Sequence, residues 1–293
     1  MKKILTLLFT ALFIFALAAC GTAEEDTQKD TDTNAGEAQD NEAAEENTEA
    51  TTIVVGSTAV PHSEVLEKAK PILAEQGIEL QIEVYQDYIL PNQDLNEDRL
   101  DANYFQHTPY LNQQVADFGY DFVSLGGVHI EPIGIYSKNI TSVDEIPDGT
   151  AVLLSNSEPD HGRILALFER EGLITIADGV EPTEALLDDI VENPKNLEFD
   201  PSYDPGFLPE YYNREEDTLV AINTNYAIEA GLLPTEDALI LEGPESPYAN
   251  LLVTKTGNEN NEALLALLEV LRSEEIQTFM EEEYSGAIVP VNE

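Results

Sequence analysis

From residue 52 onward, the sequence predicts an α/β fold with mostly parallel sheets that helices cover on both faces. Short apolar or alternating segments, typical of strands, take turns along the chain with longer segments at helical spacing. Strands that alternate with helices in this way usually form parallel sheets buried on both faces. Hydrophobic residues make up 42% of the chain, and over roughly 240 residues this is enough for one large or two smaller cores.

The first three elements are expected to form a β-α-β unit. Residues 53–56 are a short apolar strand, and residues 80–85 alternate between apolar and polar side chains as a half-buried strand does. Between them, residues 63–76 place apolar side chains at helical spacing.

The same alternation continues to the end of the chain. A helical stretch near 95–100 precedes strands at 122–125, 133–136 and 151–154, and a helix follows at about 162–171. Later strands are expected at 220–222 and 251–253, and helices at 261–271 and 274–283 complete the pattern.

Residues 1–20 have the pattern of a lipoprotein export signal. Two lysines precede an apolar stretch at 4–17, and Leu-Ala-Ala leads to Cys20, the only cysteine of the chain. Cleavage before Cys20 makes 1–19 the signal peptide, and acylation of Cys20, palmitate included, anchors the protein on the extracytoplasmic face of the cell membrane. An ordinary secretory peptide is the alternative, but Cys20 has no second cysteine to pair with.

Residues 20–51 are predicted to be the acylated cysteine and a disordered acidic tether. The segment 21–50 contains no aromatic residue and no aliphatic residue larger than alanine. It therefore cannot bury enough surface to offset the entropy of ordering. Such a charged coil holds a folded domain near a membrane but several nanometres away from it.

The chain is strongly acidic, with 58 Asp and Glu against 13 Lys and Arg and a formal net charge of −45. A surface of this kind repels nucleic acid and anionic lipid headgroups, so we expect no nucleic-acid partner. It also repels itself at low ionic strength, whereas concentrated salt screens the repulsion. The composition therefore indicates a halophilic acidic surface, with an ordinary soluble acidic protein as the alternative.

Six segments of the chain carry a family resemblance: DYILPN (87–92), DANYFQHTPY (101–110), HIEPIGIYS (129–137), IVENPKNL (190–197), INTNY (222–226) and SPYAN (246–250). They resemble the methionine-binding lipoproteins of bacterial ABC importers, the NlpA-type substrate-binding lipoproteins. The resemblance implies a two-lobed periplasmic-binding-protein fold (type II-like) with a ligand cleft between the lobes. It places lobe 1 at 52–135 plus 248–293 and lobe 2 at 136–247.

The same resemblance implies a monomeric protein that binds L-methionine or a close analogue and delivers it to an ABC permease and its ATPase. A methionine-containing dipeptide or another amino acid is the alternative ligand. A metal-binding lipoprotein is a more distant alternative, because no two of the four histidines sit at ligand spacing on one element. Motifs of enzymes are missing from the sequence, so neither catalysis nor a cofactor is expected.

A free amino acid needs a partner for its carboxylate and acceptors for its ammonium group. The resemblance assigns the carboxylate to Arg163, whose forked donors open a helix. It assigns Asn223 and Asn250, both at strand ends, to the polar groups of the ligand. Without the resemblance, an exposed arginine and ordinary turn asparagines are the simpler interpretation.

An aromatic wall for the ligand side chain is implied by Tyr88, Phe105, His107 and Tyr110. Aromatic rings suit a thioether, because sulfur is polarizable and favours ring contacts. His107 is expected to donate toward the thioether sulfur. The resemblance makes Asn225 a weaker candidate for the site and assigns Tyr248 to packing.

The sequence departs from the family pattern directly before Arg163. The family usually carries a threonine and an asparagine there, whereas this chain has Glu158, Pro159, Asp160 and His161. Asp160 lies three residues before Arg163 and is expected either to pair with it or to bind the amino group of a different ligand. The ligand of the family is therefore less firmly predicted for this chain than the fold.

Overall fold

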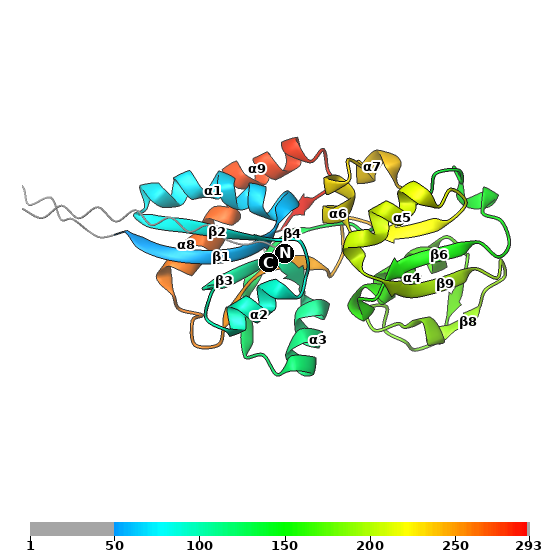
Figure 1. Cartoon of the computed structure of the whole chain (residues 1–293), viewed down its shortest axis with the longest axis horizontal. Coiled ribbons are helices and arrows are strands. Elements are labelled where there is room, and N and C mark those ends of the chain that lie inside the picture. Colours follow the sequence, from blue (N-terminus) through cyan, green and yellow to red (C-terminus); the bar gives the residue numbers. More distant parts are fainter. Residues whose placement is uncertain (1–49, 292–293) are drawn as a thin grey trace, which may run out of the picture. The chain divides into compact units, whose positions relative to one another are not determined.

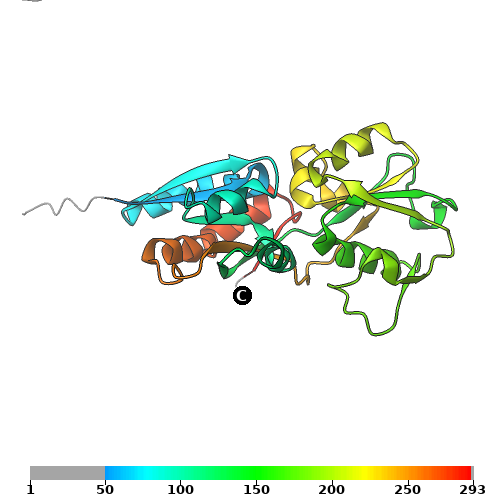
Figure 2. The same cartoon turned by 60° about the horizontal axis from the view of Figure 1, so that its bottom comes forward.

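The computed structural model describes residues 50–291, which form two mixed β-sheets with helices on both faces (Figures 1 and 2). We call the six-stranded sheet with its helices the first lobe and the five-stranded sheet with its helices the second lobe. None of the helices in this part of the chain is long and apolar enough to cross a membrane.

The first lobe is built from both ends of the described chain. Its elements are β1 (Thr51–Thr58), η1 (Ala59–Ser63), α1 (Glu64–Glu75), β2 (Ile78–Tyr85), α2 (Leu90–Asn96), β3 (Ala102–His107), α3 (Thr108–Phe118), β4 (Phe122–Ile130), β12 (Ala249–Lys255), α8 (Glu262–Leu271), α9 (Glu274–Glu283) and β13 (Val289–Pro290). The strand order is β13-β4-β12-β3-β1-β2.

The second lobe is one continuous stretch between β4 and β12. Its elements are β5 (Gly134–Tyr136), η2 (Val143–Glu145), β6 (Ala151–Ser155), α4 (Glu158–Arg170), β7 (Thr175–Ile176), η3 (Leu187–Asp189), β8 (Ile190–Glu192), β9 (Glu198–Tyr203), η4 (Pro205–Phe207), α5 (Leu208–Arg214), β10 (Leu219–Ile222), α6 (Thr224–Glu229), α7 (Pro234–Asp237) and β11 (Ile240–Leu241). Its sheet has the order β11-β5-β10-β6-β9, and β7 and β8 pair separately.

The predicted parallel arrangement is correct for only part of each sheet. Strands β2, β1 and β3 are parallel neighbours, as are β10, β6 and β9. Strands β4, β12 and β13 pair antiparallel in the first sheet, and β5 and β11 do so in the second. The antiparallel order arises because the chain crosses between lobes through β4 and β5 and returns through β11 and β12. The predicted lobe boundaries at residues 135 and 247 lie close to these connections and stay predictions.

Each sheet separates two apolar layers because successive side chains of a strand point to opposite faces. In the first lobe, α1, α8 and α9 cover one face, where Leu66, Leu264 and Met280 are buried together. In the second lobe, Val152 and Leu154 of β6 pack on the side of α4, whereas Leu153 packs on the side of α5 and α6.

The predicted elements are confirmed with shifts at their ends. The helix expected near 95–100 lies earlier, at Leu90–Asn96, because the chain turns at Asp98 with a φ of 59°. Helix α4 begins at Glu158, four residues before the predicted start at 162, with Pro159 in its first turn, where a proline is tolerated. Strand β3 and helix α3 were not predicted, and they carry much of the site.

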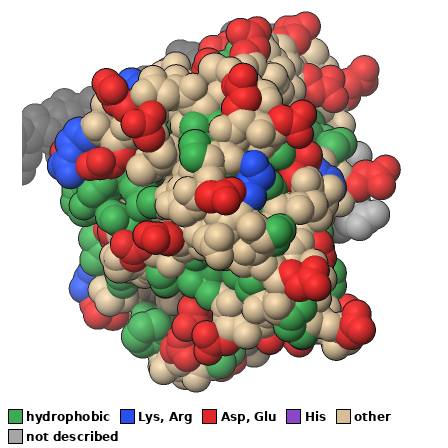
Figure 3. Space-filling view, turned by 90° about the vertical axis from the view of Figure 1, so that its right-hand side faces the viewer, with side chains coloured by type: hydrophobic (Ala, Val, Ile, Leu, Met, Phe, Trp, Pro, Cys, Tyr) green, Lys and Arg blue, Asp and Glu red, His purple; other side chains and the backbone are tan. Residues whose placement is uncertain are grey.

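Asp and Glu side chains are spread over the face shown in Figure 3, with few Lys and Arg between them. In the surface ion pair of Arg214 with Glu210, both side chains are more than half exposed. Exposed pairs of this kind stabilise a fold little. Repulsion among the remaining carboxylates therefore opposes folding unless salt screens it.

We expect the melting temperature to fall by several degrees when the folded domain is moved from molar to millimolar NaCl. Calorimetry or circular dichroism over a salt series measures this shift. An equal osmolality of sucrose, which does not screen charge, is the control and should give a smaller gain. A melting temperature that is independent of salt would remove the halophilic interpretation.

Candidate ligand-binding site

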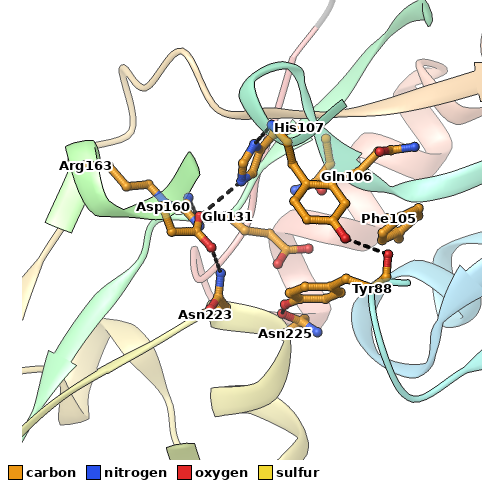
Figure 4. A pocket seen from close by; sticks show the side chains of 11 residues that line it. Tyr88, Phe105, Gln106, His107, Glu131, Asp160, Arg163, Asn223 and Asn225 are labelled. Atoms are coloured by element: carbon orange, nitrogen blue, oxygen red, sulfur yellow. Dashed lines mark hydrogen bonds and ion pairs between the residues drawn. The ribbon is translucent and has the colours of Figure 1, made fainter. Parts of the chain in front are cut away.

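A pocket lies between the two lobes, at the carboxyl ends of the parallel strands (Figure 4). Its lining residues are Tyr88, Phe105, Gln106, His107, Tyr110, Glu131, Asp160, Arg163, Asn223, Asn225 and Asn250. The cavity that these side chains enclose has a volume of about 20 Å³, so a ligand enters only when the lining side chains or the lobes move apart. Ligands in open α/β sheets bind beyond the carboxyl ends of the strands, and this pocket has that position.

Aromatic rings form one wall of the pocket. The ring centroid of Tyr88 lies 6.0 Å from that of Phe105, 6.1 Å from that of Tyr110 and 5.1 Å from that of Tyr226. The hydroxyl of Tyr110 donates to the backbone carbonyl of Tyr88 at 2.8 Å, which holds the loop after β2 against α3. Rings at these distances attract one another and form a rigid apolar surface.

Two tyrosines also join the lobes beside the pocket. Tyr88 of the first lobe donates its hydroxyl hydrogen to Asn225 Oδ1 of the second lobe at 2.6 Å. In the other direction, Tyr226 donates to the backbone carbonyl of Gln86 at 3.2 Å. These bonds place the aromatic wall opposite the amino terminus of α6.

His107 has a defined tautomer because it is the N-cap of α3. The backbone N–H of Tyr110 donates to His107 Nδ1 at 3.2 Å, so Nδ1 is unprotonated and Nε2 carries the hydrogen. That Nε2–H donates to Asp160 Oδ1 at 3.1 Å, across the two lobes. The structure therefore uses the donor that sequence analysis assigned to a thioether sulfur for a carboxylate of the protein itself.

Asp160 is the centre of the polar side of the pocket. Its carboxylate forms an ion pair with Arg163 Nη2 at 2.8 Å and accepts hydrogen bonds from His107 Nε2 and from Asn223 Nδ2, each at 3.1 Å (Figure 4). The residue is 2% exposed. Burial alone would raise the pKa of Asp160, but Arg163, helped by His107 and Asn223, holds it well below the usual range.

Arg163 is buried by packing as well as by its ion pair. Its guanidinium carbon lies 4.8 Å from the ring centroid of Tyr248, a distance typical of a cation–π contact. Its Nη1 lies 3.4 Å from the backbone oxygen of Glu131 and 3.6 Å from a carboxylate oxygen of Glu242. Within residues 50–291, Arg163 Nε and Asn223 Oδ1 have no hydrogen-bond partner.

Gly162 shows how closely helix α4 is held. A Cβ at this position would lie 2.2 Å from the backbone oxygen of Pro182, so only glycine fits there. The loop that contains Pro182 therefore presses on the first turn of the helix, which carries Asp160 and Arg163.

Glu131 is the second buried carboxylate of the pocket. His129 Nε2 lies 2.8 Å and His62 Nε2 lies 3.1 Å from Glu131 Oε1. The other ring nitrogens contact hydroxyl groups, His62 that of Thr58 at 2.7 Å and His129 that of Tyr104. With the Tyr104 hydroxyl as donor to Nδ1, His129 Nε2 carries the hydrogen and donates to Glu131. His62 Nε2 makes no hydrogen bond within the described residues.

This cluster comes from separate elements, which is why ligand spacing in the sequence did not reveal it. The ligand atoms of His62, His129 and Glu131 lie within 4.8 Å of one another. Two histidines and a carboxylate are a set that metals use. The distance from His129 Nε2 to Glu131 is, however, that of a direct hydrogen bond, and we interpret His129 as the support that orients this carboxylate.

Burial lowers the pKa of His62 to about 4 and that of His129 to about 3, and it raises the pKa of Glu131. Desolvation is the largest cause in each case, since it disfavours the charged form. Both rings are therefore neutral at pH 7.

Two further residues of the lining have different roles. Gln106 is bonded on both sides of its amide to Asn92 and Asn103, so its polar atoms support the junction of α2 and β3. Asn250 of β12 lies opposite His107 on β3 and opposite His129 on β4, which places it at the base of the pocket.

All seven residues predicted to bind the ligand line this one pocket. They are Tyr88, Phe105, His107, Tyr110, Arg163, Asn223 and Asn250. Glu131 was missed, although its HIEP segment contributed to the resemblance, and Asn225 lines the pocket as well. Tyr248 covers Arg163 rather than the pocket. The lipidation site Cys20 lies outside the described residues.

Two α/β lobes with an enclosed polar and aromatic pocket between them define a substrate-binding protein of the periplasmic-binding-protein fold. The chain belongs to the NlpA lipoprotein family, whose model matches residues 53–292.

Named relatives are similar over most of their length. The methionine-binding lipoprotein MetQ of Bacillus subtilis (strain 168) is 44% identical over 243 residues, 82% of this chain and 88% of that protein. The D-methionine-binding lipoprotein MetQ of Escherichia coli (strain K12) is 37% identical over 238 residues, 81% and 87%. The solved structure of a nutrient binding protein from Burkholderia cenocepacia bound to methionine matches with a TM-score of 0.77 and 35% identity, covering 82% of this chain and 100% of that one.

We expect the free energy of unfolding to decrease as the pH falls from about 6.5 toward 4. The unfolded chain binds protons at its histidines below pH 6.5, whereas buried His62 and His129 do not until about 4 and 3, so stability is lost across this window. At about 1.4 kcal/mol per pKa unit, His62 contributes up to about 3 kcal/mol. Glu131 acts in the opposite direction but is a single group. Urea titrations at several pH values measure the slope.

The variant His129→Gln tests the assignment, because it removes one of the two buried rings. Its pH slope should be smaller than that of the wild type. An unchanged slope would show that other groups cause the pH dependence.

Proposed function

We propose that this protein is the substrate-binding lipoprotein of an ABC importer, that it binds L-methionine or a close analogue in the pocket between the lobes, and that it is not an enzyme. The observation that carries the proposal is the pocket itself, in which an aromatic wall faces buried polar groups. Relatives named for methionine binding, and a similar structure bound to methionine, support it.

The aromatic wall suits the side chain of methionine. A thioether is polarizable and gains up to about 1.5 kcal/mol per ring contact. Tyr88, Phe105 and Tyr110 offer three ring surfaces within one small space.

The acceptors for an ammonium group lie on the other side of the pocket. Glu131 is oriented by His129, and Asn223 Oδ1 has no partner within the described chain. A buried acceptor without a partner costs free energy, which a ligand N–H group would recover. An ammonium group would also favour the ionised form of Glu131, which burial disfavours.

Ligand contacts from both lobes provide the working step of transport. A ligand that touches both lobes stabilises the closed form over the open form, and a permease can recognise that difference. The partners proposed are an ABC permease and its ATPase, with the protein acting as a monomer. The lipid anchor at Cys20 would keep it on the extracytoplasmic face of the cell membrane.

The deciding experiment is native mass spectrometry of residues 21–293 purified in high salt, followed by denaturation and identification of any released molecule. Release of methionine or a methionine derivative supports the proposal. Titration calorimetry with L-methionine covers the case of an empty protein. Metal analysis of the same sample separates the metal-binding alternative, which requires a near-stoichiometric ion.

Glu131→Gln is expected to lower the affinity for the methionine ligand by about tenfold or more, because it replaces a charged acceptor of the ammonium group with a neutral one. Calorimetry measures the loss. Glu236→Gln, a matched change at an exposed position, should bind as the wild type does. Unchanged affinity in Glu131→Gln would place the ammonium group elsewhere.

Cys20→Ser is expected to move the protein from the membrane fraction to the soluble fraction, since the acylated sulfur is lost. Cell fractionation and labelling with a palmitate analogue measure this. A variant that keeps both its membrane location and its label would rule out the anchor at Cys20.

A further inference from the structure

The pocket already contains a carboxylate in the place where the ligand carboxylate was expected. Asp160 forms an ion pair with Arg163 at 2.8 Å and accepts hydrogen bonds from the neutral donors His107 and Asn223 at 3.1 Å each. These three side chains are among the seven predicted to contact the ligand. The donor set for a carboxylate is therefore present, and a side chain of the protein takes most of it, with Arg163 Nε as the donor that has no partner within the described residues.

Asp160 cannot readily move away to release these donors. It is 2% exposed and lies in the first turn of α4, which Gly162 holds against the loop at Pro182. Its backbone N–H donates to the carbonyl of Ser157 at 3.0 Å, and the helix amino terminus favours a negative charge at this position. Displacing it would leave a buried carboxylate without its guanidinium, which costs several kcal/mol.

The balance of charges in the pocket lining also disfavours a ligand carboxylate. Asp160 and Glu131 are two buried carboxylates, and Arg163 is the one cation of the lining. A third carboxylate, brought by a free amino acid, would have to share that single guanidinium with Asp160. An ammonium group without a carboxylate would instead balance the excess negative charge.

We propose that Asp160 makes this site selective for methionine compounds whose ammonium group is free and whose carboxyl group is neutral, as in an amide. That the compound carries a methionine side chain is taken from the proposed function. Its ammonium group binds at Glu131 and the unpartnered Asn223 Oδ1, and its neutral carbonyl leaves the pair of Asp160 and Arg163 intact.

Titration calorimetry with L-methionine and L-methioninamide tests this, at a pH where the amine of the amide is protonated. The wild type is expected to bind the amide at least tenfold more tightly than the free amino acid. Asp160→Asn keeps the shape of the side chain and frees the charge of Arg163. It should shift the preference toward L-methionine by at least tenfold.

Glu158→Gln is the matched control, because it removes an exposed carboxylate from the same helical turn. It should keep the preference of the wild type. Circular dichroism verifies that Asp160→Asn is folded. If this variant does not fold, the affinities of the wild type for the two ligands still test the proposed selectivity.

Three outcomes would contradict the inference or its basis. A wild type that binds L-methionine as tightly as the amide overturns the inference and leaves the proposed function standing. A preference for the amide that Asp160→Asn does not change shows that Asp160 is not its cause. A protein that binds neither compound, together with no methionine compound released from the purified protein, overturns the proposed function.

Discussion

Burial of charge between the two lobes is the constraint on which the site depends. Asp160 and Arg163 are both almost completely removed from water, and each would be costly to bury without the other. The pair lies within one helix of the second lobe, but His107 of the first lobe completes it. In this structure the carboxylate of Asp160 therefore has all of its partners only where the two lobes meet. Glu131 follows the same rule, with histidines of the first lobe around it.

The fold brings these groups together through the ends of its strands. Tyr88 follows β2, His107 ends β3 and Asn223 follows β10, so side chains distant in the sequence meet at one level. Short connections then fix their orientation, since His107 caps α3 and Asn223 precedes α6. Because these positions are held by backbone geometry, a change of one side chain alters the chemistry of the pocket without altering the architecture.

Apolar patterns predicted about half of the described strands and helices α1, α4, α8 and α9, because periodicity reports burial directly. Strand β3 escaped prediction because its sequence ANYFQH mixes polar and apolar residues, although all six are buried. Asn103 and Gln106 can be buried there only because they bond each other and Asn92, a compensation that a linear pattern does not show.

The site was predictable to the extent that it repeats a family pattern. The seven predicted residues line one pocket, but the cluster of His62, His129 and Glu131 joins separate elements, and no spacing along the chain predicts it. Asp160 stood out as a departure from the pattern. Its hydrogen bonds to His107 and Asn223 form between segments that are distant in the sequence. Its role could therefore be recognised only from the structure.

The internal carboxylate also bears on how a ligand can signal its presence. A ligand shifts the balance between open and closed forms only by the contacts that it adds to the closed form. Here the bond from His107 to Asp160 and the bond from Tyr88 to Asn225 join the lobes through side chains of the protein itself. In the proposed transport role, the difference between the loaded and the empty protein must then come from the remaining groups. These are the aromatic wall, Glu131 and the free oxygen of Asn223. The same few side chains would therefore determine both which ligand binds and how far binding favours the closed form.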